Sequence, residues 1–249
     1  MSDLVSIITP SYNSSKFINE CINSVISQTY INWEMIIVDD CSTDNSRKKI
    51  LELSKSDNRI KFIELKDNIG PALSRNEALN LSKGKYIAFL DSDDVWKSDK
   101  LEKQINFMKS KNIGFSFTAY QPISEDAMKK YPVISAPEKI SYHSYLKNTI
   151  IGCLTVVINR EIVGDFKMPN IRTSQDMALW LIIMKRGFIA YGLQENLAYY
   201  RIVSSSNTSD KWKAALGVWI VYRKIEKLSF IYSIICFICY MFNAIKKRI

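Results

Sequence analysis

Two aspartates stand two positions apart, directly after an apolar segment of the sequence. Asp91 and Asp93 follow residues 86–90, and Ser92 separates them. Two carboxylates at this spacing can share one hard divalent cation, because Mg²⁺ and Mn²⁺ prefer oxygen ligands and often complete their shells with substrate phosphates. A lone pair of aspartates at this spacing is weak evidence for a metal site, because a solvated turn in which Asp94 caps a helix has the same composition. The pattern predicts either a metal site or such a turn.

Other polar groups follow two further apolar runs. Thr9 and Pro10 end the first run, and Asp39 and Asp40 end the second. His143 is the only histidine in the chain, so a Ser-His-Asp or Cys-His catalytic group is not expected, and a zinc site is disfavoured. Acid–base chemistry here should use carboxylates, or Lys or Tyr side chains.

The elements that position these residues alternate between strand and helix patterns. This alternation predicts an α/β fold with a mostly parallel sheet that is covered by helices on both faces. Ligands bind beyond the carboxyl ends of such strands, so the three polar clusters should converge on one crevice. Gly84 is expected to end a helix in the left-handed conformation. The expected strands are 4–9, 33–38, 60–65 and 86–90, and the expected helices are 16–28, 43–53 and 71–83.

The second half of the chain has a less regular pattern. Residues 121–148 are expected to form a long loop with short pieces of structure. Ser174 is expected to cap the helix 174–185. We expect one domain over 1–210, with a first half (1–97) and a second half (98–210), followed by a tail over 211–249. The other expected elements are a helix at 98–111 and strands at 114–120, 155–158, 188–192 and 197–200.

Four stretches of sequence in a fixed order resemble family 2 glycosyltransferases. They are VSIITPSYN (5–13), EMIIVDDCSTD (34–44), NIGPALSRN (68–76) and DSDD (91–94). The resemblance covers roughly residues 4–202 and is much more specific than any one of the four stretches. It implies the GT-A fold, an inverting mechanism and a nucleotide-sugar donor, usually a UDP-sugar. Residues 1–97 would then be the nucleotide-sugar half of the domain, and residues 98–210 the acceptor half.

The resemblance also implies roles for individual residues. Asp93 would be the chief ligand of Mn²⁺ or Mg²⁺, with Asp91 toward the ribose or the metal. A divalent ion there would neutralise the charge of a diphosphate leaving group. From the residues alone, Asp40 could instead serve a helix entry, and Arg75 could pair with Glu77 or a sheet-end carboxylate. The donor-binding residues that the resemblance implies are Pro10, Tyr12, Asp40, Arg75, Asp91 and Ser92.

The acceptor side carries a second acidic motif. Gln175 replaces the Glu that the family usually has, and Asp176 aligns with the family's catalytic base. A position near a helix N-terminus is expected to lower the pKa of Asp176. Trp180 lies four positions later and could stack on a sugar ring or belong to the core. Cys153 could likewise line the acceptor pocket or fill the core, and Asp94 is a further acceptor-side candidate.

The net charge of +9 is concentrated in the tail, where residues 211–249 hold eight basic residues and one acid, Glu226. Residues 228–245 are uncharged, with a polar stripe at Ser229, Ser233, Cys236, Tyr240 and Asn243. A basic tail around an apolar run favours anionic lipid over nucleic acid. We expect an amphipathic helix lying in the plane of the membrane; a helix docked on the protein's own body and a membrane span are the alternatives.

Together these features predict an inverting, metal-dependent hexosyltransferase bound peripherally to the cytoplasmic face of the cell membrane. The resemblance is strongest to bacterial O-antigen, lipopolysaccharide and capsule enzymes. Many of those transfer glucose from UDP-glucose to GlcNAc-diphosphoundecaprenol in a β1,3 linkage. UDP-galactose is the alternative donor. Two other classes remain: a nucleotidyltransferase, which usually needs a glycine-rich loop that residues 9–13 lack, and a non-catalytic membrane-binding module.

Overall fold

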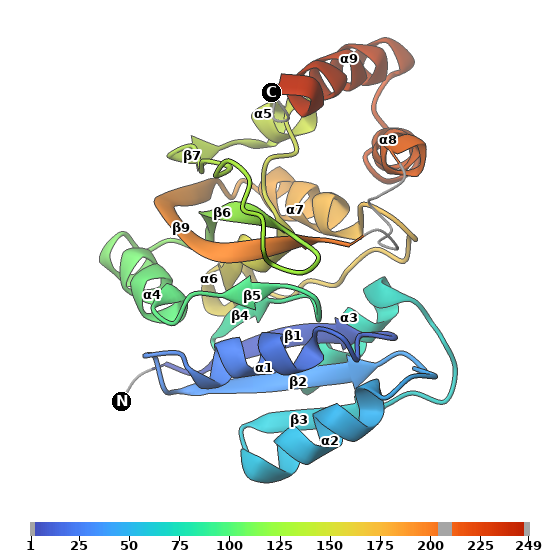
Figure 1. Ribbon diagram of the computed structural model, residues 1–249. Helices are drawn as coiled ribbons and strands as arrows, with labels where there is room; N and C mark the ends of the chain where they lie inside the picture. Colours follow the sequence, from blue (N-terminus) through green and yellow to red (C-terminus); the bar gives the residue numbers. More distant parts are fainter. Residues whose placement is uncertain (1–2, 204–210, 247–249) are drawn as a thin grey trace.

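The computed structural model describes residues 3–203 and 211–246 (Figure 1). These residues form a nine-stranded mixed sheet with the order β3-β2-β1-β4-β8-β6-β9-β5, and β7 pairs with β9. The strands are β1 (Val5–Ser11), β2 (Trp33–Asp39), β3 (Ile60–Glu64), β4 (Tyr86–Phe89), β5 (Val95–Trp96), β6 (Phe115–Ser124), β7 (Lys139–Ile140), β8 (Val157–Asn159) and β9 (Ala190–Ile202). The helices are α1 (Ile18–Ile26), α2 (Ser46–Ser56), α3 (Pro71–Leu81), α4 (Lys100–Ser110), α5 (Tyr142–Lys147), η1 (Cys153–Thr155), α6 (Arg160–Val163), α7 (Gln175–Lys185), α8 (Lys211–Ile220), η2 (Val221–Ile225) and α9 (Phe230–Lys246).

The first four strands pair in parallel, as the strand–helix alternation predicts. β1 pairs with β2 and with β4, and β2 pairs with β3. Their carboxyl ends therefore lie along one edge of the sheet, which is where the polar clusters follow each strand. The parallel pairing of these strands and the helices around them agree with the predicted α/β arrangement.

The acceptor half departs from the expected elements. β4 and β6 each pair with β8 in antiparallel fashion, so the sheet is mixed rather than parallel throughout. The two short strands expected at 188–192 and 197–200 are one continuous strand, β9. Residues 121–148, by contrast, agree with the expected loop with short pieces of structure, because they contain the end of β6, the short strand β7 and helix α5. β5, immediately after the Asp91–Asp94 turn, has no counterpart among the expected strands.

Apolar side chains fill both faces of the sheet. On β1, Ile8 joins one core cluster, whereas Val5 and Ile7 join the other, as the alternation of side chains along a strand requires. One cluster includes residues of α3 and α7, and the other includes residues of α1 and α4. The helices that carry Arg75 and Asp176 thus pack on the same face of the sheet.

Gly84 is required for space and not for a left-handed backbone. Its φ is not positive, so the predicted left-handed helix end is wrong. A Cβ at this position would lie 2.5 Å from the backbone nitrogen of Ser6 and 2.8 Å from the carbonyl oxygen of Leu4. The close approach of the chain to β1 therefore explains the glycine.

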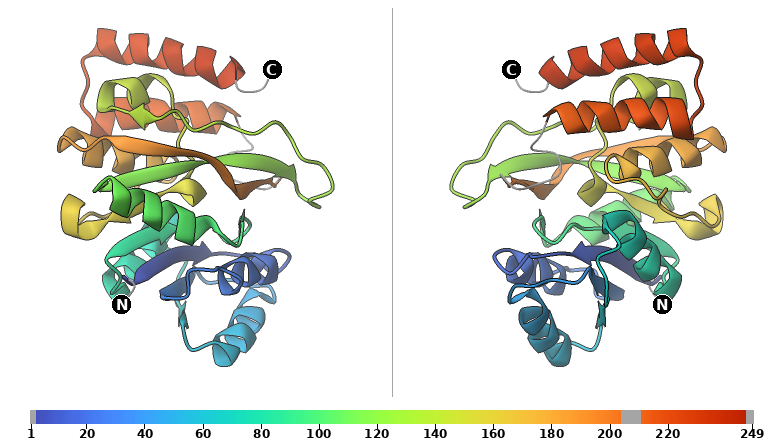
Figure 2. Two further views of the ribbon diagram at one scale, coloured as in Figure 1. Left: turned by 90° about the vertical axis from the view of Figure 1, so that its left-hand side faces the viewer. Right: turned by 90° about the vertical axis from the view of Figure 1, so that its right-hand side faces the viewer.

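The C-terminal helices pack against the domain. Val218, Val221, Tyr222 and Cys236 are buried in the same core cluster as Trp180, so the boundary expected near residue 210 does not separate two cores. All five cysteines lie in the described ranges and are free thiols; Cys21, Cys153 and Cys236 are buried, and Cys41 and Cys239 are half-buried. In both figures α9 lies at the opposite end of the molecule from α2 and β3 (Figure 2).

Candidate active site

The carboxyl edge of the parallel strands brings the first two polar clusters together. The backbone N–H of Asp40 donates to the carbonyl oxygen of Ser11 over 2.8 Å, which joins the ends of β1 and β2. Pro10 is buried within β1, and Tyr12 lies just beyond the strand with half of its surface (52%) exposed. An exposed ring at a strand end is available to stack on a planar base.

Asp40 holds the turn that begins α3. Its carboxylate accepts the backbone N–H groups of Ile69, at 2.7 Å, and Gly70, at 2.8 Å. The Asn68 side chain donates in turn to the Asp40 carbonyl oxygen at 3.0 Å. Gly70 has φ +86°, a conformation that other residues rarely adopt. Asp40 therefore serves a helix entry, which was its alternative role, and the helix concerned is α3.

Arg75 connects α3 to the Asp91 turn. Its guanidinium Nη2 donates to Asp91 Oδ1, which is the sheet-end ion pair that we had kept as an alternative. Arg75 is almost fully buried, and its Nε has no hydrogen-bond partner among the described residues. Burial opposes its charge, but the neighbouring Asp91, Cys153 and Asp176 raise the pKa of Arg75 above its ordinary value.

The turn after β4 concentrates negative charge. Burial, with the nearby Asp91 carboxylate, raises the pKa of Asp93 to about 6. Burial and the charges of Asp93 and Asp91 raise the pKa of Asp94 well above its usual range. Ser92, between the two aspartates, is half-buried. A cation would relieve the repulsion among these carboxylates, so their electrostatics fit a metal site.

The donor atoms in this turn suit a hard divalent ion. No group of three or more His, Cys, Asp or Glu side chains in residues 3–203 and 211–246 could hold a metal alone. Asp91 and Asp93 would therefore supply one or two oxygen ligands and substrate phosphates the rest, which is common for Mg²⁺ and Mn²⁺.

Asp94 ties the turn to β9 in the interior. Its carboxylate accepts the backbone N–H of Arg201 at 2.8 Å, and its surface is buried. The Arg201 guanidinium donates to the Asp93 carbonyl oxygen, also at 2.8 Å. Asp94 thus lies inside the protein and not on an open acceptor face, which corrects its assignment as an acceptor-side residue.

Asp176 lies in the first turn of α7, beside a cavity of about 180 Å³. Burial raises the pKa of Asp176, and this outweighs the backbone N–H of Met177 and the charge of Arg75, which both lower it. The expected lowering of this pKa is therefore wrong. Ser174 precedes the helix in a left-handed conformation, φ 58°, and its side chain forms no capping hydrogen bond within the described ranges, contrary to the expected cap.

Two further acceptor-side candidates differ in where the structure places them. Trp180 is completely buried, with its ring 5.3 Å from each of the rings of Phe89 and Phe115, so it belongs to the core and is not available to a sugar. Cys153 is also buried, and burial with the charge of Asp91 raises the pKa of its thiol. Cys153 nevertheless lies among Arg75, Asp91 and Asp176, close enough for their charges to act on it.

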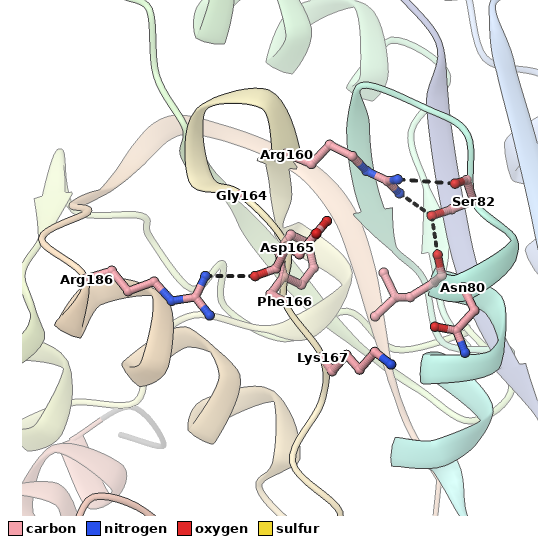
Figure 3. Close-up of a pocket in the computed structure, with 9 residues that line it drawn as sticks. Asn80, Ser82, Arg160, Gly164, Asp165, Phe166, Lys167 and Arg186 are labelled. Atoms are coloured by element: carbon pink, nitrogen blue, oxygen red, sulfur yellow. Dashed lines mark hydrogen bonds between the residues drawn. The ribbon is translucent and has the colours of Figure 1, made fainter.

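A larger cavity lies away from these residues. It measures about 570 Å³ and is bounded by the end of α3, the 164–167 loop and the end of α7 (Figure 3). α3 and α7 both start beside the carboxylates and end at this cavity, so it lies at the far side of the domain. In it, Arg160 donates to the Ser82 carbonyl oxygen at 3.2 Å, and Arg186 donates to the Asp165 carbonyl oxygen at 2.8 Å.

The polar stripe of α9 faces the protein. Ser233 and Cys236 are buried, and the Asn243 side chain donates to the Lys147 carbonyl oxygen of α5 at 3.0 Å. None of the helices in the described ranges combines the length and the apolar character needed to cross a bilayer. The opposite face is apolar and exposed; we call it the outer face of α9, and its residues are Phe230, Ile231, Ile235, Ile238 and Phe242.

The chain is similar over most of its length to named glycosyltransferases. The chain is 52% identical over 246 residues to the putative teichuronic acid biosynthesis glycosyltransferase TuaG of Bacillus subtilis, covering 99% of this chain and 98% of that protein. It is 44% identical over 219 residues to the UDP-Glc:alpha-D-GlcNAc-diphosphoundecaprenol beta-1,3-glucosyltransferase WfgD of Escherichia coli, covering 88% and 85% of the two chains.

Two solved structures share the fold. TarS of S. aureus, residues 1–349 in complex with UDP-GlcNAc, matches with a TM-score of 0.70 at 20% identity over 93% of this chain and 69% of that chain. The mannosyltransferase PcManGT of Pyrobaculum calidifontis, in complex with GDP-Man and Mn²⁺, matches with a TM-score of 0.70 at 16% identity over 90% and 64%. The family model for glycosyl transferase family 2 matches residues 6–163, more than half of the chain, and the protein belongs to that family.

Proposed function

We propose that this family 2 glycosyltransferase transfers glucose from UDP-glucose, with inversion, to a GlcNAc-diphosphate lipid in a β1,3 linkage. One observation carries the proposal. The buried Arg75 pairs with Asp91 on the donor side and is close enough to Asp176 on the acceptor side for each charge to act on the other. A donor-side and an acceptor-side carboxylate around one cation is an arrangement suited to group transfer between two bound substrates.

The relatives support this choice of substrates. WfgD, at 44% identity, and WfaP, at 38% over 99% of this chain, are both named as glucosyltransferases acting on GlcNAc-diphosphoundecaprenol. Such an acceptor belongs to O-antigen, lipopolysaccharide or capsule synthesis. The higher identity to TuaG favours a second candidate, a glycosyltransferase of teichuronic acid synthesis. Galactose is the runner-up donor sugar, since it differs from glucose in one hydroxyl orientation.

Asp176 is the proposed base. It takes the proton of the acceptor hydroxyl as that oxygen forms a bond to the anomeric carbon. The bond from this carbon to the UDP oxygen breaks, and UDP leaves with the electron pair. Burial raises the pKa of Asp176, which makes its ionised form a stronger proton acceptor.

Asp91 and Asp93 are the proposed holders of Mn²⁺ or Mg²⁺. A bound divalent ion would act as a Lewis acid toward the diphosphate oxygens. Arg75 adds a fixed positive charge on the same side, held by its ion pair with Asp91. Around the nucleotide, Tyr12 offers an exposed ring, Pro10 and Asp40 shape the strand ends, and Ser92 lies in the metal-binding turn.

The outer face of α9 is the proposed membrane contact. A lipid-linked acceptor brings the enzyme to the cytoplasmic leaflet, and an exposed apolar helix face can enter the headgroup region. The preceding segment adds Arg223, Lys224 and Lys227, whose charges complement anionic lipid. The docked helix and the membrane-surface helix, which the sequence analysis treated as alternatives, are compatible here. α9 packs on the protein with one face and offers an apolar face on the other side.

A donor screen with the purified full-length protein tests the proposal. The protein would be incubated with Mn²⁺, a synthetic short-chain GlcNAc-diphosphate lipid, and UDP-glucose, UDP-galactose, UDP-GlcNAc or GDP-mannose in parallel. We expect transfer from UDP-glucose and a β-linked product by NMR of the anomeric proton. Transfer only from UDP-galactose would show that galactose, and not glucose, is the donor sugar. An α-linked product would contradict the proposed inverting mechanism.

The same assay separates the other classes of function. A nucleotidyltransferase would release diphosphate from a nucleoside triphosphate and a sugar phosphate, whereas a glycosyltransferase releases UDP from UDP-sugar. A non-catalytic module would bind vesicles and release no UDP. Absence of UDP release with every donor would contradict the proposed function.

A further inference from the structure

A small cavity lies beside the proposed base and is enclosed partly by the C-terminal helices. It measures about 180 Å³, and Asp176, Ser174 and Met177 form the side nearest α7. Because one water molecule occupies about 30 Å³ in the liquid, the cavity has room for about six waters, a space comparable to one sugar ring. The remaining lining residues are Tyr145, Thr149, Ile151, Ala214, Val218 and Tyr240.

Helix α8 is fixed directly against the segment that precedes Asp176. A Cβ on Gly217 would lie 2.3 Å from Thr173 Oγ1 and 2.9 Å from Ser174 Oγ, so the backbone of α8 closely approaches these two side chains. Val218, one position later, is buried and lines the cavity. α8 therefore packs against the segment that leads into the helix of the proposed base.

Helix α9 supplies an aromatic wall. Tyr240 lines the cavity, and its ring lies 5.9 Å from that of Phe237 on the same helix. On the α5 side, Tyr145 is buried, and burial raises the pKa of its hydroxyl well above the usual value, so it stays protonated. Aromatic rings, hydroxyl groups and one carboxylate around a small space form a site of the kind that binds a sugar: rings contact its C–H face, and polar groups bond its hydroxyls.

We infer that α8 and α9 complete the acceptor subsite, which holds the sugar whose hydroxyl is glycosylated between Asp176, Tyr145 and Tyr240. The inference rests on the proposed function and names the part of the chain that recognises the acceptor. The C-terminal helices thus contribute to catalysis directly, in addition to any contact of the outer face of α9 with lipid.

Two substitutions on α8 test the inference as a matched pair. Ala214→Phe fills the cavity, whereas Leu216→Phe adds a ring of the same kind two residues later, where the side chain is exposed. The acceptor is a short-chain, water-soluble GlcNAc-diphosphate, so no membrane is needed. We expect Ala214→Phe to raise the acceptor KM at least about tenfold and Leu216→Phe to leave it within about twofold. Affinity for UDP, measured by calorimetry, should be retained in both, because UDP binds on the proposed donor side and not in this cavity.

A second pair of substitutions, on α9, keeps the inference testable if the α8 variants do not fold. Tyr240→Ala removes the ring and should raise the acceptor KM, and Tyr240→Phe, which keeps the ring, should restore most of the affinity. Thermal unfolding and calorimetric UDP affinity report on the fold in each variant. Unchanged acceptor KM in both Ala214→Phe and Tyr240→Ala, with an active wild type, would overturn the inference alone. A wild type that transfers to no such acceptor would overturn the proposed function and the inference with it.

Discussion

The donor and acceptor sides of the site are assembled in different ways. On the proposed donor side, Tyr12, Asp40 and Asp91 each lie just beyond one of the parallel strands, so a single geometric rule brings them together. On the acceptor side, Asp176 lies at the start of a helix whose surroundings come from α5, α8 and α9, which are distant in sequence. Donor residues are positioned by strand pairing, and acceptor residues are positioned by helix packing.

This difference has a consequence for mutation. Strands held by backbone hydrogen bonds keep their positions when one side chain changes, so donor-side substitutions should act locally. The acceptor cavity depends on how helices pack, and changes far from Asp176 in sequence should alter it. The predictions below probe this contrast, from the largest expected effect to the smallest.

Asp93→Ala should reduce transfer below detection, by more than about 10⁴-fold, since it removes the chief proposed metal ligand and several kcal/mol of charge stabilisation. The measurement is UDP release with titrated Mn²⁺. Asp165→Ala, at an exposed position, is the control. Full activity of the wild type in EDTA would refute metal dependence.

Asp93→Asn should raise the melting temperature at pH 7. Burial and Asp91 raise the pKa of the Asp93 carboxylate, so its ionised form destabilises the fold at this pH.

Asp176→Asn should lower the transfer rate by roughly 10²–10⁴-fold, the usual contribution of a general base. The change keeps the shape of the side chain, so folding and UDP binding should be retained. Transfer kinetics and calorimetric UDP affinity are the two measurements. Wild-type turnover in this variant would place the base on another residue.

Changing the outer face of α9 should weaken binding to vesicles that contain anionic lipid. Ile231→Asp with Ile238→Asp should lower the partition coefficient roughly 10–100-fold, because two apolar side chains no longer enter the bilayer. Ile31→Asp is a close control, since Ile31 and Ile231 are 74% and 73% exposed but lie in different parts of the molecule. Equal loss of binding in the control would mean that attachment is not specific to α9.

Substitution is a sharper test of membrane attachment than deletion of residues 228–249, the simplest truncation that the sequence suggests. Cys236 is buried in the core, and Tyr240 lines the acceptor cavity. Removal of α9 would therefore expose apolar surface and open the cavity as well as detach the protein. A release caused by deletion would not separate these effects.

Lys100→Met should stabilise the protein at neutral pH. Lys100 is fully buried, with Nζ donating to Gln104 Oε1 at 2.7 Å, and burial lowers its pKa to about 7. Between this value and the ordinary 10.5, the unfolded chain binds a proton that the folded chain does not, so the free energy of unfolding rises with pH across that window. The methionine variant should lack this slope.

The measurement for Lys100→Met is thermal unfolding from pH 7 to 10. The melting temperature at pH 7 should rise by about 2–4 °C for each kcal/mol gained. Lys103→Met, on the same helix but at an exposed ion pair with Asp99, should bring no such gain. If the stability of the wild type does not depend on pH between 7 and 10, the lowered pKa of Lys100 is contradicted.

The sequence predicted the candidate site best where the residues lie in short motifs directly after strands. Asp91, Arg75 and the strand ends follow from apolar runs and short motifs, and the parallel pairing of the first four strands was correctly predicted. The positions of Trp180 and Asp94 were harder to predict. Helical spacing or a place in an acidic turn does not show whether a side chain faces a cleft or the interior. Burial settles both: Trp180 packs on Phe89 and Phe115, and Asp94 bonds to β9.

Long-range packing explains the remaining differences. Gly84 looks like a helix end in sequence, but its neighbour in space is Ser6, far away along the chain. The pKa of Asp176 was expected from its helix position, yet burial by other segments decides its direction. The amphipathic pattern of α9 gave two faces without showing which one the protein covers.

The distribution of thiols gives the natural chain two positions for spectroscopic probes. Cys21, Cys153 and Cys236 are buried, and burial raises the pKa of each, which makes them slow to react with alkylating dyes. Cys41 and Cys239 are only half-buried, the first beside the Asp40 turn and the second on α9. A fluorophore at Cys41 would report arrival of the nucleotide, and one at Cys239 would report the depth of α9 in a bilayer. One molecule without engineered cysteines could therefore be followed optically at both of its ends.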